Sequence, residues 1–214
     1  MRKLKIDFVS DVACPWCAIG LHSLERALDR TRPDGIDAEL HFQPFELNPS
    51  MPADGADTVQ YLSAKYGIGP EQIAHNQAAI RQRGAEVGFA FGQRARVWNT
   101  FDAHRLLHWA GLQGRQRELK HALLKAYHGD SRNVSAHDVL VELAAQAGLD
   151  ADDAREVLQS GRYADEVRAA ETRWQQAGIH SVPAIVIDER HLISGGQPPE
   201  AFERALRQLA QQAA

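Results

Sequence analysis

Residues 4–17 have the sequence LKIDFVSDVACPWC, in which an alternating stretch leads into two cysteines that are separated by two residues. Apolar and polar residues alternate over 4–8, which is the period of a β-strand. Beyond Pro15 the apolar residues change to helical spacing, and proline is tolerated in the first turn of a helix because its missing N–H has no partner there. The sequence therefore predicts a strand, a short loop that carries Cys14, and a helix that begins beside it.

A second strand is expected soon after this helix. Residues 32–35 (RPDG) favour a turn. Residues 36–47 favour an extended chain, with Leu40 and Phe42 marking a buried face. The start of the chain therefore predicts a β–α–β unit, for which parallel pairing with a right-handed crossover is the rule.

A long helical region follows, after which the strand pattern returns. Over 58–174 almost every segment has helical spacing, with glycines where helices are expected to end. A strand is predicted at 182–187, a second strand at 191–194, and a closing helix at 199–209. The order is therefore β–α–β, a helical block, then β–β–α.

This order predicts two helix starts and a division into two domains. Ser135 and Asp138 have the spacing of a capping box, and the acidic run 150–153 favours the start of the next helix. The outer parts of the chain are expected to form one sheet with helices on its faces, and the middle to be an inserted helical domain. The fold class is thus α/β, with a sheet domain at 1–56 and 162–214 and an all-helical insertion at 57–161.

Composition limits the classes of function. The chain has 214 residues, of which 44% are hydrophobic, as in an ordinary globular protein. Its 24 Lys and Arg residues against 28 Asp and Glu residues give a net charge of −4, so the basic patch of a nucleic-acid-binding protein is not expected. The clearest apolar stretch, 182–187, is far too short to cross a membrane. With only two cysteines, the chain does not resemble a secreted disulfide scaffold, and we expect a soluble, cytoplasmic protein.

The pair Cys14 and Cys17 has the spacing and the position of a redox-active dithiol. Two cysteines on the first turn of a helix can reach disulfide geometry without backbone movement. Cys14 is expected at the N-cap, where unpaired N–H groups and the helix dipole favour a thiolate. Cys17 lies one turn inside and is expected to remain a shielded thiol. This asymmetry predicts that Cys14 attacks a disulfide and that Cys17 resolves the mixed disulfide.

Other interpretations of the pair remain open. A zinc site needs two further ligands; His22 is near in sequence, but no fourth ligand is indicated. A separate candidate metal site is the pair His104 and His108, which lie four residues apart. Arg105, however, occupies the place where a zinc-protease helix carries glutamate, so that motif is absent. Two inert buried cysteines are a further alternative. We expect no metal and no cofactor.

Two further features point to a substrate site. Val182-Pro183 opens the predicted strand, where a cis bond would leave the preceding backbone free to pair with an extended substrate. Trp16, between the two cysteines, is expected to be exposed and to contact an unfolded or apolar polypeptide. Asn99 precedes a predicted helix, and its simplest role is an N-cap.

Taken together, these motifs resemble the DsbA-type thioredoxin-fold thiol–disulfide oxidoreductases, and within them the cytoplasmic FrnE-like branch. Three other stretches are similar to that branch: 45–49 (FELNP), 99–106 (NTFDAHRL) and 194–198 (SGGQP). The resemblance spans essentially the whole chain. It implies a thioredoxin-like fold that is interrupted by a helical domain.

The resemblance also implies roles for individual residues. Cys14 would be the nucleophile, Cys17 the resolving thiol, and the loop of Val182 and Pro183 would face the substrate. Asn99 would lie on the side of the insertion that faces the active site, where it could line the substrate site.

Three functions are compatible with these features. The first is a reductase or isomerase of protein or peptide disulfides, supplied with electrons by glutathione or a thioredoxin-like donor. The second is a glutathione-dependent isomerase or transferase of the kappa-class or chromene-carboxylate isomerase type. In those relatives a serine stands in the place of Cys14, so the two cysteines argue against it. The third is a non-catalytic binding or chaperone module with a redox-sensitive clasp.

Overall fold

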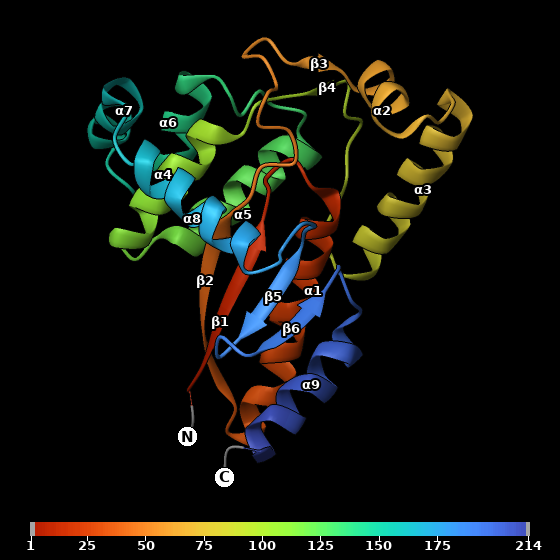
Figure 1. The fold of residues 1–214 in the computed structure, drawn as a ribbon, viewed down its shortest axis with the longest axis vertical. Helices are drawn as coiled ribbons and strands as arrows, with labels where there is room; N and C mark the ends of the chain where they lie inside the picture. The colour runs from red at the N-terminus through yellow and green to blue at the C-terminus, as the bar shows by residue number, and fades with distance from the viewer. Residues whose placement is uncertain (1–2, 213–214) are drawn as a thin grey trace.

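The computed structural model describes residues 3–212. Its main sheet has four strands in the order β2-β1-β5-β6 (Figure 1). β1 (Lys3–Ser10) pairs in parallel with β2 (Asp37–Pro44) and antiparallel with β5 (Ala184–Ile187), which pairs antiparallel with β6 (His191–Ser194). The first and last parts of the chain thus form one sheet, as the sequence predicts.

One face of the sheet is covered by α1 (Pro15–Thr31) and α9 (Pro199–Gln212) (Figure 1). Phe8 of β1 and Ile185 of β5 point to this face and join the apolar cluster of both helices. Gly20 of α1 allows two loops to approach it closely. A Cβ at this position would lie 3.1 Å from Pro183 Cγ and 3.2 Å from Gly196 Cα.

The other face is covered near one end by α8 (Ala164–Gln176). Neighbouring residues of a strand point to opposite faces, so Val9 and Ala184 face this side and pack against Trp174 of α8. The predicted layers, a sheet with helices on both faces, are confirmed.

The region between β2 and α8 contains two groups of helices. The α2–α3 hairpin consists of α2 (Thr58–Tyr66) and α3 (Pro70–Glu86) and lies on one side of the molecule (Figure 1). The second group packs around its own apolar core and consists of α4 (Phe101–Leu112), α5 (Gln116–Leu124), the π-helix η2 (Lys125–Gly129), α6 (His137–Gln146) and α7 (Ala151–Ser160).

The nearly continuous helical pattern expected over this region is wrong in one respect. Two short strands, β3 (Ala56–Asp57) and β4 (Arg96–Val97), pair on either side of the α2–α3 hairpin. Strands of two residues are too short to leave a period in the sequence. This pairing of β3 with β4 also brings the two ends of the α2–α3 hairpin together.

The α5 helix is attached to the free edge of β2 by one side chain. The amide of Gln116 accepts the N–H of Phe42 at 2.9 Å and donates to the Phe42 carbonyl oxygen at 3.0 Å. These are the two bonds that a neighbouring strand would make to Phe42. Gln116 therefore fixes α5 at a defined place along β2.

Of the two predicted helix starts, one is confirmed. Asp150 caps α7 and accepts the N–H groups of Asp152 and Asp153 at 2.8 and 2.9 Å. The capping box is wrong, because α6 is preceded by Ala136 and the Ser135 hydroxyl donates to the carbonyl of Ala53 instead.

The domain boundaries at 1–56, 57–161 and 162–214 stay a prediction, and their outermost residues 1–2 and 213–214 lie outside the described part of the chain. Over residues 3–212, no helix is both long enough and apolar enough to span a bilayer.

Candidate active site

Cys14 occupies the N-cap of α1, with backbone angles in the extended region. The N–H of Cys17 donates to the Cys14 carbonyl at 3.1 Å, so the two cysteines share the first turn of the helix. Both are free thiols, with Cys14 4% and Cys17 0% exposed. Both side chains are therefore buried, and only Cys14 keeps a small accessible area.

The loop before β5 faces Cys14. The Val182-Pro183 peptide bond is cis, as predicted. The Cys14 thiol donates to the carbonyl oxygen of Val182, with 3.6 Å between the sulfur and the oxygen, although the two residues are 168 positions apart. Antiparallel pairing of Val9 with Ala184 brings this loop to the end of β1 from which the Cys14 loop leaves.

The loop between β1 and α1 is held by side chains from the helical region. His128 Nε2 lies 2.8 Å from the Val12 carbonyl oxygen, and Arg94 donates to the Ala13 carbonyl at 3.1 Å. Burial lowers the pKa of His128 to about 3, so the ring is neutral and can donate one N–H to Val12. The sequence gives no signal for this pair, because both residues lie more than 75 positions from the loop and match no motif.

Asp11, three residues before Cys14, is a buried carboxylate with four partners. It accepts the N–H groups of Ala13 and Leu47 at 3.1 and 2.8 Å. The Thr100 hydroxyl donates to it at 2.8 Å, and His104 Nε2 lies 3.3 Å from it. Burial raises the pKa of Asp11, but the hydrogen bonds and the charge of His104 bring it below its ordinary value. Asp11 therefore joins the Cys14 loop to the end of β2 and to α4.

The two thiols have different surroundings. Burial raises the pKa of Cys17 well above its ordinary value, and the hydrogen bond and charge of Cys14 raise it further. A thiol in this position keeps its proton at neutral pH. Of the two sulfur-bearing residues, Cys14 is the one that lines the groove described next.

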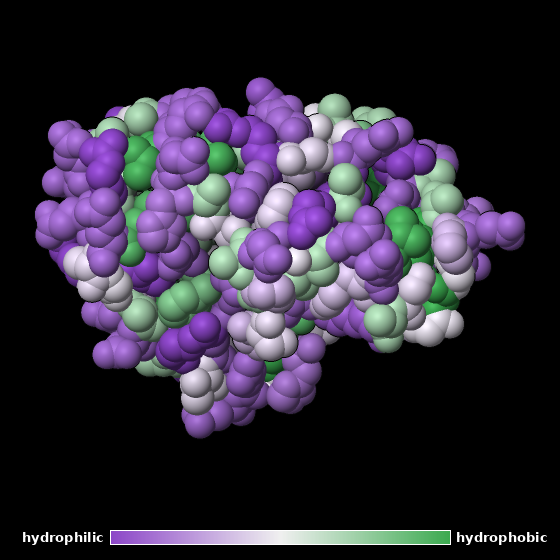
Figure 2. Space-filling view, turned by 90° about the horizontal axis from the view of Figure 1, so that it is seen from above, coloured by the Kyte–Doolittle hydropathy of each residue, from purple (hydrophilic) through white to green (hydrophobic). Residues whose placement is uncertain are grey.

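A groove of about 500 Å³ runs from Cys14 to the α2–α3 hairpin. Trp16, which is 40% exposed, lies on its near side, and Tyr61 and Tyr66 lie on the wall formed by α2. Its charged lining residues are Lys65 and Arg94, and none is acidic. Figure 2, which views the molecule from above, shows hydrophobic side chains gathered on the side of this hairpin. The groove is thus mainly apolar, and both of its charged lining residues are basic.

The predicted site residues fall into two sets. Cys14, Trp16 and Val182 line the groove, whereas Cys17 and Pro183 are buried behind it. Asn99 is not a lining residue of the groove. The N-cap of α4 is Thr100, so the expected N-cap role of Asn99 is wrong by one residue. The Asn99 side chain instead accepts the N–H of Phe101 and donates to the Met51 carbonyl, each at 2.9 Å, and so ties the start of α4 to the loop before β3. Its contact with substrate stays a prediction.

Comparison with known proteins agrees with this geometry. Residues 5–207 match the family model of the DSBA-like thioredoxin domain. The uncharacterized protein YwbO of Bacillus subtilis is 28% identical over 202 residues, which cover 94% of each chain. The crystal structure of a probable DsbA oxidoreductase from Streptomyces coelicolor is 39% identical, with a TM-score of 0.89 over 96% of this chain and 89% of that chain.

A more distant structure shares the fold. The cytosolic disulfide reductase DsbM from Pseudomonas aeruginosa, solved with GSH, is 18% identical and has a TM-score of 0.64 over 97% of this chain and 99% of that chain. At this identity the similarity concerns the fold alone.

Proposed function

We propose, since the chain belongs to the DSBA-like thioredoxin domain family of oxidoreductases, that it exchanges thiols for disulfides in protein or peptide substrates through Cys14 and Cys17. The observation that carries this proposal is the asymmetry of the pair. The Cys14 sulfur lies at the groove and 3.6 Å from the Val182 carbonyl oxygen, whereas Cys17 is fully buried with a raised pKa.

The reaction proceeds in two exchanges. The Cys14 thiolate attacks the substrate disulfide, so a Cys14–substrate disulfide forms and one substrate thiolate leaves. The Cys17 sulfur, after losing its proton, attacks Cys14; the Cys14–Cys17 bond forms and the second substrate thiolate leaves. Two electrons pass to the substrate. A thiol donor such as glutathione or a thioredoxin-like protein then reduces the pair again.

Trp16 and Val182 are the substrate-contacting part of this proposal, whereas Pro183, which is buried behind the groove, would support the loop from within. Trp16 and the tyrosines of α2 supply apolar walls for a polypeptide segment. The backbone at Val182 lies where an extended segment would pass to place its disulfide against Cys14. Asn99 would act indirectly, by holding the start of α4 in place through its bond to the Phe101 N–H.

We further propose that the protein works in the reducing cytoplasm, as a reductase or isomerase of the FrnE-like branch. The stretches 45–49, 99–106 and 194–198 support the branch, and DsbM, which shares the fold, is a cytosolic disulfide reductase. The charged residues that line the groove, Lys65 and Arg94, are both basic, so the groove also suits an anionic tripeptide thiol such as glutathione. The same feature keeps the glutathione-dependent isomerase as the second candidate function.

Reduction of insulin disulfides with glutathione or dithiothreitol as donor tests the main proposal. We expect turnover by the wild-type chain, none by Cys14→Ser, and a trapped mixed disulfide with Cys17→Ser. The second candidate is correct if the wild-type chain isomerises a glutathione adduct and Cys14→Ser keeps the full activity of the wild-type chain. If the wild-type chain does neither and forms no mixed disulfide, both proposals fail.

A further inference from the structure

Two positively charged side chains reach the substrate groove from different elements, and within the described part of the chain neither is paired with a carboxylate. Lys65 of α2 donates to the Leu47 carbonyl at 3.0 Å and to the Asn48 side-chain oxygen at 2.6 Å. Arg94, which precedes β4, donates to the Ala13 carbonyl at 3.1 Å. All of these acceptors are uncharged, so both positive charges remain without a counter-charge at the groove.

Arg94 is held beside the cysteine loop. Its acceptor, Ala13, is the residue immediately before Cys14. The guanidinium also lies against Tyr127, 5.6 Å from the ring centroid, and burial raises the pKa of Tyr127 to about 12, so that neighbour is uncharged. A guanidinium has five N–H donors in a planar fork that matches a carboxylate, and these two partners leave several donors available. Arg94 therefore offers an anion-binding group next to the reactive cysteine.

A small side cavity continues the groove past Arg94. Pro15 and Gln77 line both the groove and this side cavity, which Arg81 of α3 also lines. Arg81 is exposed, and within residues 3–212 it makes no hydrogen bond or ion pair. His128, which lines the side cavity too, is neutral because burial lowers its pKa to about 3. The uncompensated positive charge therefore extends beyond the groove itself.

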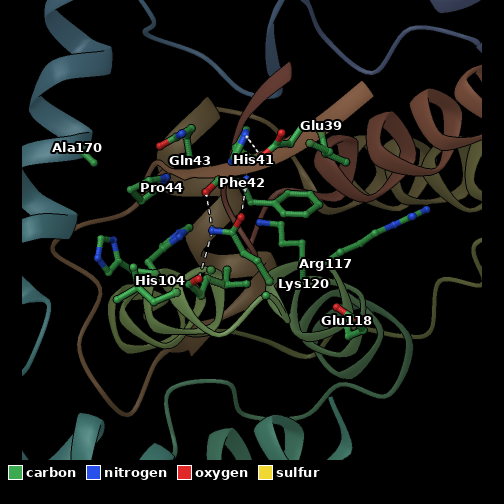
Figure 3. A pocket seen from close by; sticks show the side chains of 17 residues that line it. Glu39, His41, Phe42, Gln43, Pro44, His104, Arg117, Glu118, Lys120 and Ala170 are labelled. Atoms are coloured by element: carbon green, nitrogen blue, oxygen red, sulfur yellow. Dashed lines mark hydrogen bonds and ion pairs between the residues drawn. The ribbon is translucent and has the colours of Figure 1, made fainter. Parts of the chain in front are cut away.

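The absence of acidic side chains is a local property of this groove. The whole chain has 28 acidic against 24 basic residues, and a second cavity of similar size, about 510 Å³, has lining residues of both signs (Figure 3). Three of the lining residues of that cavity form ion pairs with partners of opposite charge: Glu39 with Lys3, Arg117 with Glu25, and Glu118 with Arg115. The cations of the substrate groove have no such partner among the described residues.

A polypeptide segment with an acidic residue near its disulfide would supply the missing charge. Hydrogen bonds from a guanidinium to a carboxylate are shorter and stronger than those between neutral groups. Opposite charge on the two partners also speeds their encounter. The apolar walls of the groove, which include Trp16 and Tyr61, suit the rest of such a segment.

We propose that the groove selects polypeptide disulfides whose cysteine is flanked by aspartate or glutamate, and that Arg94 binds the flanking carboxylate. This inference rests on the proposed function and adds a substrate class to it. The carboxylate accepts from the Arg94 guanidinium while the Cys14 thiolate attacks the adjacent substrate sulfur; the Cys14–substrate disulfide forms and one substrate thiolate leaves. Arg94 determines specificity in this step and exchanges no electrons.

Three disulfide-linked peptides, identical except for Glu, Gln or Lys beside the cysteine, test this selection. Each is mixed in excess with pre-reduced enzyme, without a thiol donor, and the second-order rate constant of enzyme oxidation is measured. Division by the rate constant of the same peptide with dithiothreitol alone removes the effect of the flanking charge on the disulfide itself. For the wild type we expect the Glu peptide to react about fivefold faster than the Gln peptide, and the Lys peptide slowest. The differences should shrink in about 1 M NaCl, which screens charges.

Variants of Arg94 separate charge recognition from support of the loop. Arg94→Gln should abolish the preference for the Glu peptide, and Arg94→Glu should reverse it in favour of the Lys peptide. Loss of the bond to Ala13 slows all three peptides by a common factor, which cancels in their ratio. The matched control is Arg96→Gln, because Arg96 is exposed, lies 5.1 Å from the Trp98 ring centroid and does not line the groove. This control should keep the wild-type preference.

The outcomes separate this inference from the proposed function. A wild-type chain that reacts with none of the three peptides refutes the proposed function. Equal normalised rate constants for the three peptides refute the selection, and a preference that persists in Arg94→Gln refutes the role of Arg94. If only glutathione disulfide reacts in an Arg94-dependent way, while the peptides react equally, the guanidinium serves glutathione and the inference is wrong. Should Arg94→Gln not fold, Arg94→Met takes its place with the same expected loss of preference.

Discussion

His128 Nε2 lies 2.8 Å from the carbonyl oxygen of Val12, two residues before the reactive cysteine. His128 belongs to η2, the π-helical turn that follows α5. Such turns occur often at functional sites because they rotate the following side chains relative to a regular α-helix. A histidine from the helical region thus determines where one carbonyl of the cysteine loop points.

This contact predicts an acid-sensitive fold. The pKa of His128 is lowered to about 3 in the folded chain, so below its unfolded value of about 6.5 the unfolded chain binds the additional proton. The contribution of His128 to stability is therefore present above pH 6.5 and is lost as pH falls toward 3, with a slope of up to about 1.4 kcal/mol per pH unit. Urea unfolding at several pH values measures it. In His128→Gln, whose amide can still donate to Val12, the slope should decrease by this amount; an unchanged slope would refute the assignment.

The positions of the two thiols relative to the groove predict the order of their alkylation, because Cys14 lines the groove and Cys17 does not. Short pulses of iodoacetamide followed by peptide mass spectrometry should label Cys14 first at every pH at which the chain is folded. Cys17 should be labelled only at much higher pH or after unfolding, because it is fully buried and its pKa is raised. Earlier labelling of Cys17 would reverse the assignment of roles.

The close packing around Gly20 predicts that adding one methyl group there disturbs the site. In Gly20→Ala the new Cβ would lie within 3.2 Å of both Pro183 and Gly196, so these loops must move. We expect a loss of about 1–3 kcal/mol in the free energy of unfolding, as in overpacked cores, together with slower formation of the mixed disulfide. Gly69→Ala is the matched control, because nothing lies within 4 Å of its Cβ. Equal behaviour of the two variants would mean that the loops tolerate displacement.

The position of Trp16 on the groove predicts that its removal affects polypeptide substrates more than small disulfides. Trp16→Ala removes an exposed wall of the groove and should leave stability within about 0.5 kcal/mol of the wild type. The KM for unfolded polypeptide substrates that contain a disulfide should rise several-fold, while the rate with a small aromatic disulfide changes little. A parallel loss with both substrates would place Trp16 in the chemistry of Cys14 rather than in substrate binding.

The part of the site that lies within one local segment could be predicted from sequence. The alternation before Cys14 and the helical spacing after Pro15 place the cysteine pair at the start of α1, where the structure has it. The cis Val182-Pro183 bond and the return of β5 beside β1 also follow from short patterns.

The residues that support the pair could not be predicted in this way. His128 and Arg94 come from distant segments, and each is a single residue whose spacing resembles that of ordinary core or surface positions. The Ser135 hydroxyl does not cap α6, because the helix begins one residue later, with Ala136 at its N-cap, and the hydroxyl lies against the distant Ala53 carbonyl and Asn133. Tertiary contacts of this kind leave no period in the sequence.

Gln116 has a further consequence for a protein that handles unfolded chains. The outer edge of β2 is a template on which any extended polypeptide could add itself as another strand, and Gln116 occupies the backbone groups of Phe42 on that edge. We expect an unfolded client therefore not to add itself as a strand along β2 at Phe42. The helical region then keeps this part of the sheet edge from pairing with another chain, in addition to holding the cysteine loop in place.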